Sequence, residues 1–481
     1  MTKDNNILIC AAIPYLSGDM HVGNAMDGIY ADCLARYYRK QGKDVEFTLG
    51  TDDHGIKVQR KAEEAGLSPR DYADGEYDKF TDNYKKLSVD YSVFTRTSAD
   101  KSHQDGVLVA WDKIQKYIYK DVYKGKYDAK EEQFVTLEEA RQIKEQDPDR
   151  YERLEDTEEE NYFFRLSDFN DTLLEKIESD EIRIIPKRAK QEILGLLKGG
   201  LQDISFTRPS SKVSWGIPIP NDPDQVMYVW LDALMNYITA VGYPSDKYQD
   251  FWPCDVQVIG KDIARFHATI WPAILIALEL PVYKTLYVHG HVSMNNKPMS
   301  KSLGNVLVPD DVISKYNSDV LRYYLMRHIP SHGDGDFSWD KLRAAYNGEL
   351  ANDLGNVVSR TAAMINKYFE GQIGELAKPD NDITEYHNSI EEMHFDRALD
   401  FIFRLLQDIN KYIEDQKPWA IAKEGDEDKL RAVLSTVTTN IVQVADLIEP
   451  FLPETGAKIN KIFAANKIDF DGSPLFPRIE E

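Results

Sequence analysis

Two short polar stretches of the chain contain the residue types that bind nucleotide phosphates. The first is PYLSGDMHVGNAM (residues 14–26), in which His21, Gly23 and Asn24 stand between a strand-like and a helix-like segment. The free N–H groups and dipole of a helix start attract phosphate, Gly23 permits close approach, and His21 and Asn24 can donate hydrogen bonds. On its own, however, the pattern is more typical of an ordinary strand-to-helix turn with a surface histidine.

The second stretch is NKPMSKSLGN (residues 296–305), which is small, polar and rich in lysine and serine. Lys301 could neutralise a departing pyrophosphate, and its small neighbours would let the loop close around that group. Most lysine–serine loops are solvated turns, so this stretch alone does not establish a site. The two stretches gain meaning only when they are taken together.

The segments around the first stretch predict a parallel sheet. Residues 6–15 contain a short apolar run ended by a proline, residues 25–43 have apolar side chains at helical spacing, and residues 44–55 form a strand that breaks into a loop. Strand, helix and strand in this order form a βαβ unit, so we predict a doubly wound α/β domain. From about residue 339 onward the period is helical nearly throughout, which predicts a helical bundle.

The composition limits the classes of protein that fit the chain. It has 481 residues, with 81 acidic and 58 basic side chains, and a formal net charge of −23. This length predicts several domains, and the acidic balance means that any contact with nucleic acid depends on local positive charge. Three cysteines without a CxxC pair exclude a disulfide framework and a thiolate zinc site. No apolar run is long enough to span a membrane.

The motifs resemble, in their order, the methionyl-tRNA synthetase family of class I aminoacyl-tRNA synthetases. The HxGN turn and the MSKS loop correspond to the paired signatures of that class, and the other matching segments are GTDDHG, ENYFFRLSDF, YVWLDA, IGKDIARFHATIWPA and GELANDLGNVVSR. The resemblance extends from about residue 7 to residue 420. It implies activation of methionine by ATP, release of pyrophosphate, and transfer of methionine to the 3′ adenosine of tRNA(Met).

The resemblance also implies a domain order. We expect a Rossmann-like catalytic domain in two halves, a connective insertion, a region with the MSKS loop and the stem contact, and an anticodon-binding bundle. The predicted ranges are 1–118 and 211–285 for the catalytic halves, 119–210 for the insertion, 286–345 for the stem-contact region and 346–481 for the bundle. No appended module follows the bundle, so we expect a monomer, and the cysteine usage suits the cytoplasm.

The family motifs assign residues to each substrate. His21, Asn24 and Lys301 would contact the ATP phosphates and act in catalysis, while Gly260 and Asp262 would contact the adenosine. Magnesium would accompany ATP, held mostly by phosphates and water.

Asp52 would pair with the ammonium group of methionine. The other residues expected at the methionine site are Ala12, Ile13, Tyr15, Trp230, Ala233, Leu234, Tyr237, Ile263, Phe266, His267 and Trp271. Sulfur packs well against aromatic edges, and Tyr15 and His267 could hydrogen-bond to the thioether. Such contacts would matter because size alone separates apolar side chains by only about 1–3 kcal/mol.

For tRNA, the resemblance points to one helical face and one tryptophan. Asn352, Asn356 and Arg360 follow one another at four-residue steps, and Trp419 is where the family stacks an anticodon base. Local positive charge would come from Arg360, Lys367, Lys411 and Lys417 in the bundle and from Lys187, Arg188 and Lys190 near the end of the insertion. We therefore expect tRNA binding to weaken steeply with salt.

Three departures from the family pattern stand out. Asn24 replaces the last histidine of the HIGH signature, and Pro298 replaces the first lysine of KMSKS, with Lys297 one residue upstream. In the insertion, Asp128 and Glu131 occupy the positions of the first cysteine pair of the family's zinc knuckle. Because structural zinc needs thiolate or imidazole ligands, we predict no structural zinc.

Other functions stay open at this point. A class I synthetase for another apolar amino acid would share both signatures, although the aromatic set argues against it. A nucleotidylyltransferase without a tRNA substrate can share the HxGH-like turn, but it would not need the bundle. A catalytically inert relative that binds tRNA would explain the departures at Asn24 and Pro298.

Overall fold

The computed structural model describes residues 5–16, 18–128, 133–135, 137–299, 304–372, 374, 376–463 and 467–479. The chain divides into two compact units. Unit 1 comprises Met1–Met20, Tyr38–Lys85 and Asp90–Val288, and unit 2 comprises His21–Tyr37, Lys86–Val89 and His289–Glu481. We describe each unit by itself.

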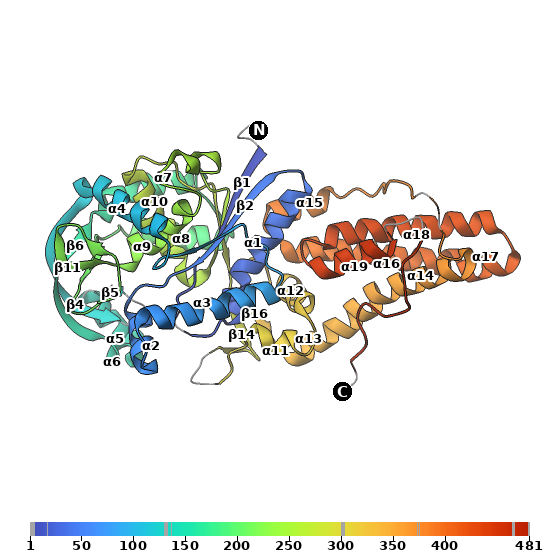
Figure 1. Cartoon of the computed structure of the whole chain (residues 1–481), viewed down its shortest axis with the longest axis horizontal. Coiled ribbons are helices and arrows are strands. Elements are labelled where there is room, and N and C mark those ends of the chain that lie inside the picture. The colour runs from blue at the N-terminus through green and yellow to red at the C-terminus, as the bar shows by residue number, and fades with distance from the viewer. Residues whose placement is uncertain are drawn as a thin grey trace. The chain divides into compact units, whose positions relative to one another are not determined.

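Unit 1 is built on a six-stranded sheet with the order β3-β2-β1-β12-β13-β7, of which Figure 1 labels β1 and β2. The strands are β1 (Asn6–Ala11), β2 (Asp44–Thr51), β3 (Val93–Arg96), β7 (Arg183–Ile185), β12 (Val256–Gly260) and β13 (Thr285–His289). The pairing is parallel: Cys10 of β1 is in register with Thr48 of β2 on one side and with Gln257 of β12 on the other. The order reverses at β1, and ligands of such sheets bind beyond the carboxyl ends of the strands at this switch point.

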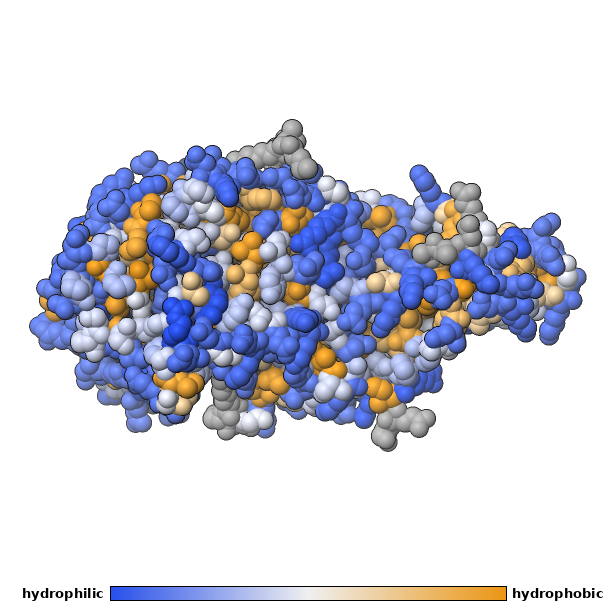
Figure 2. Space-filling view, in the orientation of Figure 1, coloured by the Kyte–Doolittle hydropathy of each residue, from blue (hydrophilic) through white to orange (hydrophobic). Residues whose placement is uncertain are grey.

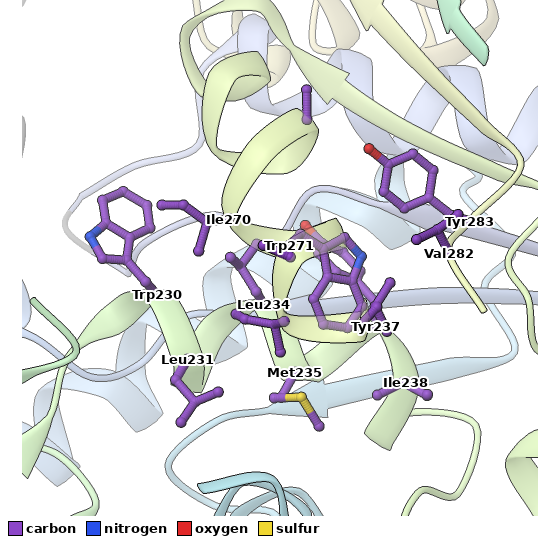
Figure 3. Packing of buried hydrophobic residues seen from close by; sticks show 14 of the residues in the cluster. Trp230, Leu231, Leu234, Met235, Tyr237, Ile238, Ile270, Trp271, Val282 and Tyr283 are labelled. Atoms are coloured by element: carbon purple, nitrogen blue, oxygen red, sulfur yellow. The ribbon is translucent and has the colours of Figure 1, made fainter. Parts of the chain in front are cut away.

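Helices cover the face of the sheet that carries Leu8 and Cys10 of β1 and, just after this strand, Ala12. These side chains belong to the main buried core together with residues from α4 (Lys101–Lys113), α9 (Val229–Thr239) and α10 (Ala264–Ala277). Figure 3 shows part of this core, with Trp230, Leu234 and Tyr237 along α9 and the indole of Trp271 beside Tyr237. The helices α9 and α10 are both strongly apolar, as expected for helices that are buried on most of their circumference.

An antiparallel sheet of unit 1, with the order β5-β4-β6-β8, lies in the region predicted as the insertion. Its strands are β4 (Ile118–Asp128), β5 (Gln133–Val135), β6 (Glu155–Phe164) and β8 (Ile204–Ser205), and α5 (Leu137–Gln146) and α6 (Pro148–Glu152) lie between β5 and β6. Lysines of β4 face the acidic run of β6 in a ladder of ion pairs: Lys120–Glu160 at 2.9 Å, Lys124–Glu158 at 2.7 Å and Lys126–Asp156 at 2.9 Å. The acidic run therefore pairs with its own sheet.

Further elements of unit 1 flank the sheets. The helices are α2 (Ile56–Ala65), α3 (Pro69–Lys86), α7 (Asn170–Glu178) and α8 (Lys187–Lys198), and a small antiparallel sheet contains β9 (Thr207–Pro209), β10 (Pro218–Ile219) and β11 (Asp222–Met227). On α8, Arg188 pairs with Glu192 and Lys190 pairs with Asp180. Two of the three basic residues expected to attract tRNA here are thus already balanced by carboxylates.

Unit 2 contains most of α1 (Val22–Lys40), a three-stranded sheet and the bundle. The sheet has the order β15-β14-β16, with β14 (Val292–Met294), β15 (Lys297–Pro298) and β16 (Gly335–Phe337). The helices after β15 are α11 (Pro309–Ile313), α12 (Ser318–Arg327), α13 (Trp339–Ala345), a π-helix (Tyr346–Gly355), α14 (Asn356–Phe369), α15 (Thr384–Glu391), α16 (Phe395–Gln416), α17 (Pro418–Glu424), α18 (Glu427–Ile448) and α19 (Pro453–Phe463). The parallel sheet and the C-terminal helices confirm the expected fold class.

Buried polar contacts fix α1 within unit 2. Asp32 accepts from Arg36 Nε at 2.8 Å and from Arg322 Nη2 at 2.7 Å, and Arg322 also donates to the carbonyl of Phe451. Tyr30 donates its hydroxyl to the carbonyl of Leu325. These bonds hold the helix that His21 precedes and whose first turn carries Asn24.

The surface agrees with the polar composition. Figure 2 shows mostly hydrophilic residues on the face in view, with apolar residues scattered among them. In the described part of the chain, every helix is too short or too polar to cross a membrane.

Candidate active site

The residues expected to bind methionine meet at the switch point of unit 1. Pairing between β1 and β2 continues beyond the strands: Asp52 donates its N–H to the carbonyl of Pro14 at 3.0 Å, and Tyr15 and Asp52 form a parallel bridge. Ala12 donates its N–H to Val258 of β12 at 2.9 Å. The backbone after β1 therefore brings Tyr15 beside Asp52, whose side chain is buried.

One face of α9 and the start of α10 supply the apolar residues. Trp230, Ala233, Leu234 and Tyr237 recur at helical spacing on α9, and Ile263, Phe266, His267 and Trp271 do so at the start of α10. The ring centroids of Trp230 and Phe266 lie 4.1 Å apart, and those of Tyr237 and Trp271 lie 5.9 Å apart. The structure thus brings together the aromatic residues that the motifs assigned to one pocket.

His267 is held as a neutral ring. Its Nδ1 lies 3.0 Å from the carbonyl of Ile263, which can only accept, so Nδ1 carries the proton and Nε2 accepts from the hydroxyl of Tyr237 at 2.7 Å. Burial lowers the pKa of His267 to about 4, which agrees with a neutral side chain at physiological pH. Both ring nitrogens are engaged, so a contact between His267 and the thioether requires one of these bonds to open.

The residues expected at adenosine follow the neighbouring strand. Gly260 is the last residue of β12, and Asp262 lies in the single turn that joins this strand to α10. Because β12 is next to β1 in the sheet, this turn stands at the same carboxyl edge as Ala12 and Ile13.

His21 and Asn24 form a reciprocal contact at the start of α1 in unit 2. Asn24 donates its backbone N–H to Nδ1 of His21 at 3.2 Å, and the N–H of His21 donates to Oδ1 of Asn24 at 3.4 Å. A side-chain carbon at Gly23 would lie 2.9 Å from the imidazole, which explains the glycine between them. Since Nδ1 accepts, the proton of the neutral ring is on Nε2, where it can be donated to an oxyanion.

The structure describes the two flanks of the MSKS loop. Lys301 lies outside the described residues, together with Ser300, Ser302 and Leu303. On the flanks, Pro298 and Lys297 pair with Ser293 and Met294 as β15 and β14.

The loop's far flank is tied to α1. Asn305 donates its side-chain N–H to the carbonyl of Pro298 at 2.9 Å. Leu307 accepts from the N–H of Val22 at 3.0 Å. Val22 at the start of α1 is therefore joined within unit 2 to the segment that follows the MSKS loop.

The anticodon residues lie on the helices after α13. Asn352 is inside the π-helix and accepts from Arg478 at 3.2 Å, whereas Asn356 and Arg360 are on α14. Arg360 is held by Glu414 and Asn410 of α16, each at 3.0 Å. Trp419, at the start of α17, is one of the most exposed large apolar side chains among the described residues, at 38%.

The insertion shows what stands at one of the knuckle positions. Asp128 pairs with Arg150 Nε at 2.8 Å, and the carboxylate is buried while the guanidinium is partly exposed. Glu131 lies outside the described residues. Among the residues that are described, no group of three or more histidine, cysteine, aspartate or glutamate side chains could hold a metal ion.

The sequence analysis missed a polar face on α9. Asp232, Asn236 and Thr239 are all buried, and Asp232 contacts the two histidines His54 and His103. Their spacing of four and three residues within an otherwise apolar helix is a signal that could have found them.

Family models match nearly the whole chain. The model described as tRNA synthetases class I (M) matches residues 7–153 and 147–362, and the anticodon binding domain of methionyl tRNA ligase matches residues 371–473. Methionine–tRNA ligase from Listeria monocytogenes is 37% identical over 525 residues, covering 99% of this chain and 79% of the relative. The Thermotoga maritima methionine–tRNA ligase is 38% identical, covering 98% and 76% respectively.

Solved structures agree with the sequence comparison. The Mycobacterium tuberculosis methionyl-tRNA synthetase in complex with methionyl-adenylate superposes with a TM-score of 0.91 at 31% identity, covering 98% of this chain and 100% of that one. The apo form of the same synthetase gives a TM-score of 0.84. From the motifs, the fold and these matches, the chain belongs to the methionyl-tRNA synthetase family of class I aminoacyl-tRNA synthetases.

Proposed function

We propose that this chain is a methionine–tRNA ligase that forms methionyl-adenylate from methionine and ATP and then transfers methionine to the terminal adenosine of tRNA(Met). The observation that supports this most is the buried aromatic cluster beyond the end of β1, with Asp52 beside Tyr15. Apolar and aromatic side chains beside one carboxylate suit an amino acid whose side chain is apolar and whose amino group is charged.

Methionine would lie with its ammonium group at Asp52 and its side chain among the aromatic residues. The thioether is flexible and polarizable, and sulfur packs favourably on the edges of rings such as Trp230 and Trp271. Neutral His267 adds no charge to this pocket, which favours an uncharged side chain.

Activation is a displacement at phosphorus. An oxygen of the methionine carboxylate attacks the α-phosphorus of ATP, the bond from that phosphorus to the bridging oxygen breaks, and pyrophosphate leaves with both electrons of that bond. His21 through Nε2–H, Asn24 through its amide and Lys301 through its ammonium would stabilise the phosphate charge as it develops. Gly260 and Asp262 would hold the adenosine, and Mg²⁺ would come as part of the substrate, coordinated by phosphates and water.

The bundle would recognise the anticodon. Glu414 and Asn410 orient the Arg360 guanidinium before RNA arrives, so less side-chain freedom is lost on binding. Asn352 and Asn356 can bond base edges, and exposed Trp419 offers a stacking surface for an unpaired base. We further propose that the enzyme works as a monomer in the cytoplasm, which size-exclusion chromatography with light scattering and fractionation of cells would test.

ATP–pyrophosphate exchange with each of the twenty amino acids tests the proposal directly. Exchange with methionine alone, followed by charging of tRNA(Met), is the expected result. Exchange with leucine or valine instead would overturn the assignment of the pocket. Binding of tRNA without exchange for any amino acid would identify the chain as an inert relative.

A further inference from the structure

The polar face of α9 holds two histidines through one carboxylate. Asp232 Oδ2 lies 2.6 Å from Nδ1 of His54, and its Oδ1 lies 2.9 Å from Nε2 of His103. A carboxylate only accepts, so both imidazoles donate to it. Burial alone would raise the pKa of Asp232, but the facing His54 and His103 hold it well below its usual value.

Each histidine comes from a different part of unit 1. His54 follows Asp52 by two residues in the GTDDHG loop, and the edge of Trp215 packs against its ring with centroids 5.2 Å apart. His103 lies on α4, which packs along α9, and its Nδ1 is 2.8 Å from the hydroxyl of Thr239. One imidazole thus bridges Asp232 and Thr239, two turns apart on α9.

The middle residue of the face fixes the same surface by close packing. Asn236 lies so near β2 that a side-chain carbon at Gly50 would be 2.9 Å from its Nδ2. The polar face of α9 therefore contacts three elements. Asp232 contacts the Asp52 loop through His54, Asn236 packs against β2, and Thr239 contacts α4 through His103. The opposite face carries Trp230, Ala233, Leu234 and Tyr237, which the proposed function assigns to the side chain of methionine.

We propose that Asp232 is a positioning residue for methionine: by binding His54 and His103 it sets the rotation of α9 and its distance from the Asp52 loop. The inference rests on the proposed function, because it concerns the same pocket. Asp52 would hold the ammonium group and α9 the side chain, so the tie of 2.6 Å from His54 to Asp232 fixes the separation of the two contact points. The adenosine residues Gly260 and Asp262 are on other elements and do not depend on this tie.

Matched pairs of variants test the tie without a large change of volume. The amide nitrogen of asparagine stands where Nδ1 of histidine stands, so His54→Asn keeps the donor to Asp232 and His54→Leu, of similar shape, loses it. The nitrogen of glutamine stands in the place of Nε2, so His103→Gln keeps its donor and His103→Met loses it. Thr239→Val is a milder third variant, and Thr207→Val, which removes a buried hydroxyl bonded to Gln225, is the control for loss of stability alone.

The measurement is ATP–pyrophosphate exchange, with KM determined separately for methionine and for ATP and with a melting temperature for each variant. We expect His54→Leu and His103→Met to raise the KM for methionine by about tenfold or more, the size of a misplaced binding contact, and to leave the KM for ATP within about twofold. His54→Asn should stay within about threefold of the wild type for both substrates, and His103→Gln, which also loses the bond to Thr239, should raise the KM for methionine no more than Thr239→Val does.

Two results would overturn the inference while the proposed function stands. One is an equal KM for methionine in the donor-keeping and donor-losing members of each pair, and the other is a rise in both KM values together. If the donor-losing variants do not fold, Thr239→Val decides: a raised KM for methionine relative to Thr207→Val supports the tie, and an unchanged KM refutes it. A wild-type chain that does not activate methionine would instead overturn the proposed function, and the inference with it.

Discussion

His21 and Asn24 bind each other through one side-chain and one main-chain group each, in a closed pair at the first turn of α1. The pair fixes which nitrogen of His21 carries the proton and leaves the Asn24 amide N–H₂ to other partners. It also shows how asparagine can stand where relatives have histidine: its carbonyl oxygen accepts from the His21 N–H while its nitrogen can still donate to phosphate.

Substitutions of His21 should separate the two ring nitrogens. His21→Gln places an amide N–H near the position of Nε2, whereas His21→Asn places one near Nδ1. We expect His21→Asn to lower kcat for ATP–pyrophosphate exchange by about a hundredfold and His21→Gln by about tenfold, because only the second keeps a donor toward the phosphates. Equal losses would mean that Nε2 is not the catalytic donor.

The two lysines of NKPMSKSLGN should contribute unequally to the rate of activation. Lys301→Ala should lower the activation rate by a factor of about a hundred or more, as when a transition-state electrostatic contact is removed. Lys297→Ala should cost much less, because Lys297 is exposed in the β14–β15 pair next to Pro298. Single-turnover formation of the adenylate measures both. Losses of the same size would show that the shifted lysine fully replaces the missing one.

The stability of the protein should fall with acid partly through His267. In the folded state, burial lowers the pKa of His267 from 6.5 to about 4. Between pH 6.5 and pH 4, therefore, the histidine binds a proton in the unfolded chain but not in the folded chain. This contribution is fully present above pH 6.5 and decreases as the pH falls toward 4, by up to about 3 kcal/mol. Urea melts between pH 4 and pH 7 check it.

The control for that prediction is His267→Gln, which cannot gain a proton. Its free energy of unfolding should depend less on pH over this window than that of the wild type. Parallel curves for the two proteins would show that His267 does not titrate with the pKa that its burial implies.

Trp419 should matter for tRNA and not for activation. Trp419→Ala should weaken tRNA(Met) binding by about 1–3 kcal/mol, the usual worth of one stacked base, and Trp419→Phe should lose less. Exchange without tRNA should be unchanged in both. Binding of the wild type should also fall steeply with salt, as phosphate contacts require, and a binding constant independent of salt would contradict the basic contacts proposed around Arg360.

The insertion should need no metal. Chelators should leave its melting temperature unchanged, and elemental analysis should find no stoichiometric zinc. Arg150→Met should destabilise the insertion by about 2 kcal/mol, because it leaves the buried Asp128 carboxylate without this ion pair. Stoichiometric zinc in the purified protein would contradict the prediction.

Much of the site followed from local spacing. The positions of Trp230 and Tyr237 on one face of α9 are fixed by helical periodicity, and Asp52 follows directly from the end of a predicted strand. The partners of Asp232 and Asp128 could not be predicted in this way. His103 and Arg150 are far from them along the chain, and only tertiary packing decides which donor a buried carboxylate receives.

The π-helix also could not be predicted from the sequence. The residues from Tyr346 to Gly355 have the apolar pattern of an ordinary helix, and four-residue steps from Asn352 through Asn356 to Arg360 fit either form. Contacts distant in the sequence hold this segment: Asn347 exchanges two hydrogen bonds with the backbone of Ile479, and Tyr346 donates its hydroxyl to the carbonyl of Pro477.

A π-helix carries more residues per turn than the α-helix that follows it, so the length of this segment determines the angle at which α14 begins. Insertion of a single codon between Gly355 and Asn356 that leaves the π-helix unchanged would lengthen the α-helix and turn everything after it by about 100°, the angle of one α-helical residue. Asn356 and Arg360 would then face another direction although neither had changed. Insertions and deletions in this part of the gene should therefore be selected against as strongly as substitutions of the anticodon residues themselves.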